Sequence, residues 1–167
     1  MADVRQFEIE IQRDWVLITY DIPAKMDASR KRVIRALRSM GALKHTDSVY
    51  YLPASKKAIQ LAETLPGEVY VWRSSLTSDT QAKRLTQEYY NKIVEGINKL
   101  HERINNLEHN FPILSLEAKK QRLNYSIKLF NSLKAAAANN MGMRVYERLA
   151  DVGQRLDTLK EQFWGAT

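Results

Sequence analysis

Two kinds of hydrophobic pattern divide the chain near Leu76. Before this point, β-branched and aromatic residues form short runs separated by proline and glycine. After it, apolar residues recur every three or four positions, which is the period of a helix that buries one face. The pattern therefore predicts two domains: an α+β domain over residues 1–76 and a helical domain over residues 77–167.

The first domain contains a strand–helix–strand pattern twice. Strands are predicted over residues 15–20, around residues 44–45, and over 48–53 and 68–74, and helices over 27–40 and 55–64. The resulting order is the ferredoxin-like βαββαβ arrangement. Residues 4–12 alternate apolar and polar side chains, which predicts an additional edge strand, with a mobile tail as the alternative.

The second domain is predicted to be an antiparallel bundle of three long helices. Ser78 and Gln81 fit a capping box at the start of the first helix, and Pro112 ends it. Ser115 caps the second helix, whose apolar residues run from Leu116 to Ala137. The third helix carries heptad-spaced apolar residues, namely Val145, Leu149, Val152, Leu156, Leu159 and Phe163.

The net charge of +7 is concentrated in two segments of the 167 residues. Residues 27–41 hold five basic residues against one acidic residue, a net of +4, and residues 111–144 hold six against one, a net of +5. Clustered basic residues are typical of surfaces that bind polyanions, nucleic acids above all. The charge distribution therefore favours nucleic acid as the partner.

The helix over 27–40 is the main candidate surface, because its basic residues lie opposite its apolar face. Arginine, which suits phosphate through two parallel hydrogen bonds, occupies four of the five basic positions. We predict nucleic-acid contacts at Lys31, Arg32, Arg35 and Arg38, and in the second basic segment at Lys119, Lys120 and Arg122. The alternative is an ordinary solvated helix face.

Asp21 is a candidate metal ligand, because it ends the first strand directly before Ile22 and Pro23. Mg²⁺ usually takes one or two carboxylates together with phosphate oxygens. Two copies of Asp21 facing each other across a dimer axis could supply such a site. In the alternative interpretation, Asp21 caps the turn before Pro23 or pairs with a nearby arginine.

Other candidate chemistry is sparse. The aromatic residues Tyr50, Tyr51, Tyr70 and Trp72 lie on predicted strands, where rings can stack on bases. Consecutive residues of a strand point to opposite faces, so about half of these rings should belong to the core or to a subunit interface. The chain contains no cysteine, and its three histidines lack metal-ligand spacing, so we assign no catalytic residue and no resident metal or cofactor.

The N-terminal residues lack the apolar core of a signal peptide. No apolar run approaches the roughly 20 residues that cross a bilayer. We therefore expect a cytoplasmic protein without membrane contact.

Three segments carry a resemblance to known families: residues 15–23 (WVLITYDIP), 30–42 (RKRVIRALRSMGA) and 47–53 (DSVYYLP). They resemble the N-terminal domain of the chromate-resistance regulator ChrB family, and the similarity extends to the charged helical region. Residues 15–75 also resemble the small CRISPR-associated ferredoxin-fold protein of the spacer-integration complex.

The ChrB-like resemblance implies a non-catalytic, DNA-associated regulatory module that forms a homodimer. The chain ends near the predicted bundle, so we do not expect the further domain of full-length ChrB proteins. The second resemblance implies a metal-dependent nuclease in which paired Asp21 carboxylates of a dimer bind Mg²⁺. A third alternative is a protein-interaction scaffold, in which the heptad helix over 145–163 pairs with another chain.

Overall fold

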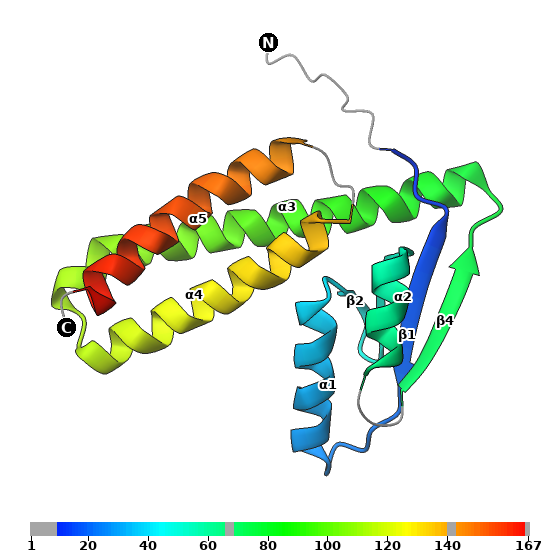
Figure 1. Ribbon diagram of the computed structural model, residues 1–167, viewed down its shortest axis with the longest axis horizontal. Coiled ribbons are helices and arrows are strands. Elements are labelled where there is room, and N and C mark those ends of the chain that lie inside the picture. Colours follow the sequence, from blue (N-terminus) through cyan, green and yellow to red (C-terminus); the bar gives the residue numbers. More distant parts are fainter. Residues whose placement is uncertain (1–9, 66–68, 140–142, 166–167) are drawn as a thin grey trace.

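The computed structural model describes residues 10–65, 69–139 and 143–165. Within these residues, four strands form one antiparallel sheet, and five α-helices complete an α+β fold with a long C-terminal helical region, as predicted (Figure 1). The elements are β1 (Asp14–Tyr20), α1 (Asp27–Ser39), β2 (Leu43–Thr46), β3 (Val49–Pro53), α2 (Lys56–Glu63), β4 (Val69–Ser75), α3 (Asp79–Asn110), the short 3-10 helix η1 (Phe111–Ile113), α4 (Leu116–Ala137) and α5 (Met143–Trp164). Among the described residues, no helix combines the length and the hydrophobicity that a membrane-spanning segment requires.

The sheet has the strand order β2-β3-β1-β4, and every neighbouring pair is antiparallel. In the centre of β1, Leu17 lies opposite Tyr51 of β3 and Trp72 of β4. Ile18 points to the other face, is fully buried, and lies opposite Tyr50. α1 and α2 cover this second face, while α3 crosses only one end of the first face.

The predicted strands and short helices agree with the observed elements to within about one or two residues, the usual uncertainty of element ends. The edge strand predicted over residues 4–12 falls mainly on residues 1–9, which lie outside the described residues. Residues 10–12 are described and are not in a strand.

Gly41 ends α1 and also sets how closely α1 approaches α4. Its φ of +82° is a conformation that glycine adopts without the steric penalty of a side chain. A Cβ atom at this position would lie 2.6 Å from the carbonyl carbon of Ala135 in α4. The missing side chain therefore allows the end of α1 to pack against the backbone of α4.

α3 buries one continuous stripe of side chains along its length. Ser78 caps this helix by accepting a hydrogen bond from the backbone N–H of Gln81 at 3.4 Å, as the sequence predicts. The helix ends at Asn110, where Pro112 enters η1. The buried residues of the stripe are Ala82, Thr86, Tyr89, Ile93, Ile97, Leu100, Ile104 and Leu107.

α4 and α5 pack against α3 and against each other. Ser115 caps α4 by accepting a hydrogen bond from Ala118, and all six heptad residues predicted for α5 are buried. Leu116, the first of the apolar residues that predict this helix, is not buried, because it is 69% exposed. It lies in the first turn of α4, beyond the buried side chains of that helix, which begin with Leu123.

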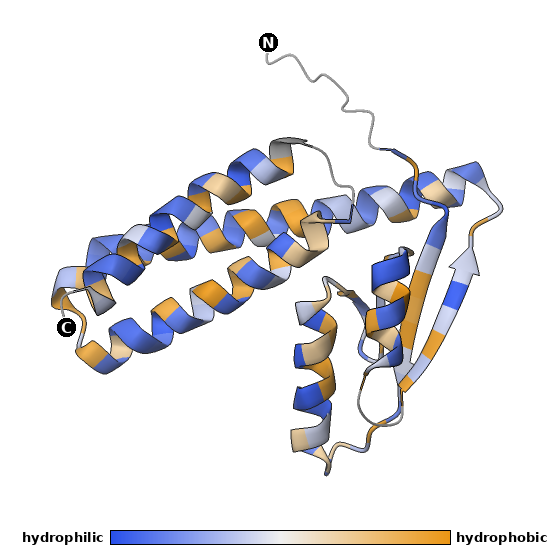
Figure 2. Cartoon of the chain, in the orientation of Figure 1, coloured by the Kyte–Doolittle hydropathy of each residue, from blue (hydrophilic) through white to orange (hydrophobic). Residues whose placement is uncertain are grey.

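The sheet and the helical region share one hydrophobic core. The rings of Trp15, Tyr51 and Tyr89 lie 5.5–5.7 Å apart, so a residue of α3 packs directly on two residues of the sheet. Figure 2 shows how apolar positions alternate with hydrophilic ones along all three long helices. The division into domains at Leu76 stays a prediction.

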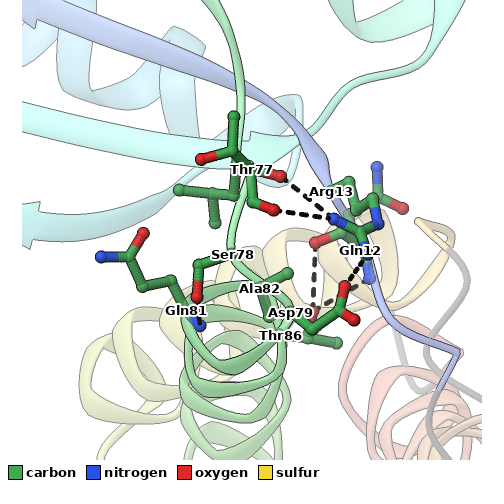
Figure 3. A network of polar contacts seen from close by, with 9 residues as sticks. Gln12, Arg13, Thr77, Ser78, Asp79, Gln81, Ala82 and Thr86 are labelled. Atoms are coloured by element: carbon green, nitrogen blue, oxygen red, sulfur yellow. Dashed lines mark hydrogen bonds and ion pairs between the residues drawn. The ribbon is translucent and has the colours of Figure 1, made fainter.

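A polar network ties the start of β1 to the start of α3 (Figure 3). The guanidinium group of Arg13 donates to the carbonyl oxygen of Leu76 at 3.3 Å and forms an ion pair with Asp79. The backbone N–H of Gln12 donates to the hydroxyl of Thr86 at 3.0 Å. These contacts hold the N-terminal end of α3 against the sheet.

Candidate nucleic-acid interface

α1 presents its basic residues to solvent, as the spacing predicts. Val33 and Leu37 are buried against the rest of the protein. The four candidate side chains, Lys31, Arg32, Arg35 and Arg38, are all exposed. Arg30, the fifth basic residue of this helix, is only partly exposed.

Few of these cations are occupied by neighbouring groups. Lys31 pairs with Asp27 at 2.6 Å, but both side chains are about two-thirds exposed (68% and 65%), and such surface pairs contribute little energy. Arg35 donates from Nε to the carbonyl oxygen of Lys31 at 3.2 Å, and its terminal nitrogens have no partner among the described residues. Within the described residues, Arg32 and Arg38 form no ion pair.

The second basic segment divides between different environments. Lys119 is partly buried, and its ammonium group lies 4.9 Å from the centre of the Phe111 ring. This contact makes the ammonium group less available to bind a polyanion. Lys120 is exposed on α4. Arg122 is also exposed and lines a groove between α3 and α4.

Arg103 and Tyr125 also line this groove, and neither belongs to the residues predicted from the sequence to bind nucleic acid. The guanidinium group of Arg103 lies 4.7 Å from the centre of the Tyr125 ring. Each residue is eleven positions from Leu114, in the connection between α3 and α4. A helical hairpin centred on that connection brings them together, so the sequence signal was the symmetry about Leu114.

Among the described residues, the two basic segments approach each other where the end of α1 packs on the C-terminal part of α4. α1 packs against α4 where Gly41 touches the backbone of Ala135, and Arg38 and Lys134 are close neighbours of these two residues in the chain. Arg122 lies thirteen residues before Ala135, or roughly 20 Å along the helix at 1.5 Å per residue. The candidate residues therefore form two separate basic surfaces, one on α1 and one near the start of α4.

Asp21 directly follows β1 and is exposed. Among the residues that the structure describes, no three histidine, aspartate or glutamate side chains come together in a way that could hold a metal ion. Asp21 therefore belongs to no such cluster among these residues, and a Mg²⁺ site at this position would draw ligands from a second copy or from phosphate oxygens.

The four strand aromatics separate into two pairs. Tyr50 and Tyr51 are buried, although they point to opposite faces, because α1 and α2 cover one face and Tyr89 of α3 covers part of the other. Tyr70 and Trp72 are 62% and 57% exposed on β4. The expectation that about half of these rings are buried is confirmed.

His45 belongs to a polar cluster that joins the sheet to α3. Its ring lies 3.3 Å from the carboxylate of Glu88, which also accepts hydrogen bonds from Tyr51 at 3.1 Å and from Lys92 at 3.0 Å. Burial alone would raise the pKa of Glu88, but the hydrogen bonds from Lys92, Tyr51 and His45 together lower it. The cluster therefore keeps Glu88 ionised and holds α3 against β2 and β3.

None of the protein-family models, curated proteins or solved structures compared with this chain matches it. The resemblance to the ChrB N-terminal domain consequently rests on the short motifs of residues 15–53 and on the charged helical region.

Proposed function

We propose that this protein binds nucleic acid, DNA in the first place, as a non-catalytic regulatory module similar to the ChrB N-terminal domain. The observation that carries the proposal is the exposed basic row of α1, where Arg32 and Arg38 form no ion pair within the described residues. Arginines in this state can neutralise phosphates and release the counterions condensed on the polynucleotide. The basic row of α1 contacts the phosphate backbone of the nucleic acid, so it supplies affinity and register rather than sequence specificity.

We further infer that the sheet with α1 and α2 is a ferredoxin-like unit and that α3, α4 and α5 form an antiparallel bundle. The element order βαββαβ and the strand order β2-β3-β1-β4 support this inference. The fold positions α1 as a rigid platform, because its apolar side is fixed on the sheet and its C-terminal end on α4.

We propose that the protein acts as a cytoplasmic homodimer, as the resemblance to ChrB implies. A dimer would double the number of basic rows that contact one duplex and so steepen the salt dependence of binding. Light scattering coupled to gel filtration measures the oligomeric state directly. A monomeric mass across the concentration range used for binding would remove this part of the proposal.

The scaffold alternative finds less support. It requires the apolar seam of α5 to pair with another chain, but its heptad residues from Val145 to Phe163 are buried within this chain. An exposed basic helix and a buried seam together favour a polyanion over a partner helix.

Charge reversal on α1 tests the proposed function. The double variant Arg35→Glu/Arg38→Glu should lower the affinity for a 20-base-pair duplex by tenfold or more at 50 mM salt, because two phosphate contacts are lost and repulsion is added. Both side chains face solvent, so the far-ultraviolet circular dichroism spectrum should stay unchanged. The matched control is Lys83→Glu/Arg84→Glu, which makes the same change of net charge at two exposed positions of α3.

An equal loss of affinity in both double variants would mean that only net charge matters and would overturn the assignment to α1. No detectable binding of wild-type protein to DNA or RNA at 50 mM salt would refute the function itself. Repeating the assay with Mg²⁺ and with Asp21→Asn tests the nuclease alternative, which requires cleavage that disappears in the variant.

A further inference from the structure

The groove between α3 and α4 is the strongest further candidate for a binding site. It has a volume of about 770 Å³ and is open to solvent. Its lining includes charged, amide and aromatic side chains from both helices, among them Lys99, Glu102 and Arg103 of α3 and Gln121, Arg122 and Tyr125 of α4. This volume falls in the range of small-molecule sites, but most of the lining residues carry charged, amide or hydroxyl groups, whereas most such sites are lined mainly by apolar residues.

Arg103 is held in place by the Tyr125 ring. A guanidinium group 4.7 Å above an aromatic ring gains a cation–π attraction, and its N–H groups at the edge of the plane remain free to donate. Tyr125 is 53% exposed, so this pair stands at the surface and not in the core. Arg122 lies three residues before Tyr125 on α4, one helical turn away, and lines the same groove.

The charges of the groove favour an anion. Within the described part of the chain, neither Arg103 nor Arg122 forms an ion pair, whereas Lys99 is paired with Glu95 at 2.7 Å. The remaining charged group of the lining is Glu102. Two free guanidinium groups and one carboxylate leave the groove with a net positive charge.

The groove on the other side of α3 has the opposite charge. It lies between α3 and α5 and is lined by Glu102, Glu147 and Asp151 against Arg148. Arg148 is moreover hydrogen-bonded to the side chain of Asn98. A basic groove and an acidic groove thus flank one helix, so a general excess of positive charge does not account for the free arginines.

We propose that the α3–α4 groove binds a phosphate group through Arg103 and Arg122, with Tyr125 as a positioning residue for Arg103. A phosphate fits because its oxygens accept two parallel hydrogen bonds from each guanidinium group. Two sources could supply this phosphate group: the backbone of a polynucleotide or a small phosphate ligand. The first source rests on the proposed function. A polynucleotide would reach this groove as a contact surface distinct from α1.

The first arm of the test uses inorganic phosphate. In ¹H–¹⁵N spectra of the full chain, the arginine Nε–Hε resonances assigned by Arg103→Ala and Arg122→Ala should shift on titration, while that of Arg148 stays in place. Tyr125→Phe keeps the ring and should retain the shifts, whereas Tyr125→Leu should weaken those of Arg103. Unchanged Arg103 and Arg122 resonances would overturn the proposal.

The second arm uses a 20-base-pair duplex between 50 and 200 mM salt. Each phosphate contact contributes about 0.9 to the steepness of log affinity against log salt concentration, so losing two contacts reduces it by about 1.8. Across this fourfold range of salt, the affinity of the variant should therefore fall by a factor about 12 times smaller than that of the wild type. The variant Arg103→Ala/Arg122→Ala should show this reduced fall. The control Arg84→Ala/Arg148→Ala, which removes two exposed arginines outside the groove, should keep the wild-type slope.

The two arms separate this inference from the proposed function. Phosphate shifts with an unchanged duplex slope support the groove and identify a small phosphate as its ligand. Phosphate shifts without any duplex binding by the wild type support the groove and refute the proposed function. A normal loss of binding in Arg35→Glu/Arg38→Glu, combined with no effect of the groove variants in either arm, overturns the groove and leaves the proposed function standing.

Discussion

The hydroxyl of Tyr89 connects three parts of the protein, and removing it tests whether they are held as described. It donates to the carbonyl oxygen of Gly41 at 2.7 Å and lies 3.3 Å from that of Ala136. It also accepts a hydrogen bond from the side chain of Asn139 at 3.3 Å. Tyr89 is fully buried, and burial raises the pKa of its hydroxyl, which therefore remains a donor at neutral pH.

The variant Tyr89→Phe keeps the ring contacts with Trp15 and Tyr51 and removes only the oxygen atom. It leaves the buried carbonyl of Gly41 without this donor, and an unsatisfied buried acceptor costs about 1–3 kcal/mol. For a chain of this size, a loss of about 2 kcal/mol corresponds to a fall in melting temperature of about 4–8 °C.

Thermal and urea unfolding followed by circular dichroism measure this loss. The adjacent Tyr90 provides the matched control, because its hydroxyl makes no hydrogen bond within the described residues. Tyr90→Phe should change the free energy of unfolding by less than about 0.5 kcal/mol. Equal effects of the two variants would show that the Tyr89 hydroxyl does not secure Gly41, and the described role of this contact would be refuted.

Two further predictions concern Gly41 and Glu88. Gly41→Ala should lower the free energy of unfolding in urea by at least about 1–2 kcal/mol from its positive φ alone, and by more than Gly153→Ala, whose added Cβ meets a movable side-chain ring and not backbone. A smaller loss in Gly41→Ala than in Gly153→Ala would contradict the close approach of α1 to α4. Because folding lowers the pKa of Glu88, ionised Glu88 stabilises the folded state at pH values above its ordinary pKa of 4.5. This contribution is lost as the pH falls through the pKa of Glu88 in the folded protein. The stability difference between wild type and Glu88→Gln should therefore shrink from pH 7 to pH 3, and a constant difference would rule out Glu88 as its source.

The elements that follow local rules could be predicted from the sequence. The caps at Ser78 and Ser115 depend on residues three positions apart. Pro112 favours the end of α3 for a local reason, because proline has no backbone N–H to donate to a helical hydrogen bond. The buried seam of α5 follows from its heptad spacing, and the exposure of Arg35 follows from its position opposite the apolar face of α1. In each case, neighbouring residues or the period of the element determine the local structure and the environment of the side chain.

Contacts between elements far apart in the chain could not be predicted in the same way. Periodicity placed Leu116 on an apolar face but could not show where the buried side chains of α4 begin. Equal spacing about Leu114 places Arg103 and Tyr125 at the same level of two adjacent helices, but their contact also depends on which faces of these helices meet. The contact of His45 with Glu88 depends on where α3 crosses the sheet. Packing and the direction of the connecting turns decide such contacts, and a single sequence does not encode them in local spacing.

The aromatic cluster of Trp15, Tyr51 and Tyr89 has a consequence for handling the protein in pieces. A fragment cut before α3 would leave two large rings of the sheet bare, next to the solvent-facing rings of β4, and such a surface invites aggregation. A fragment expressed for separate study of the sheet should therefore include the first turns of α3 through Tyr89, so that the Tyr89 ring still covers Trp15 and Tyr51.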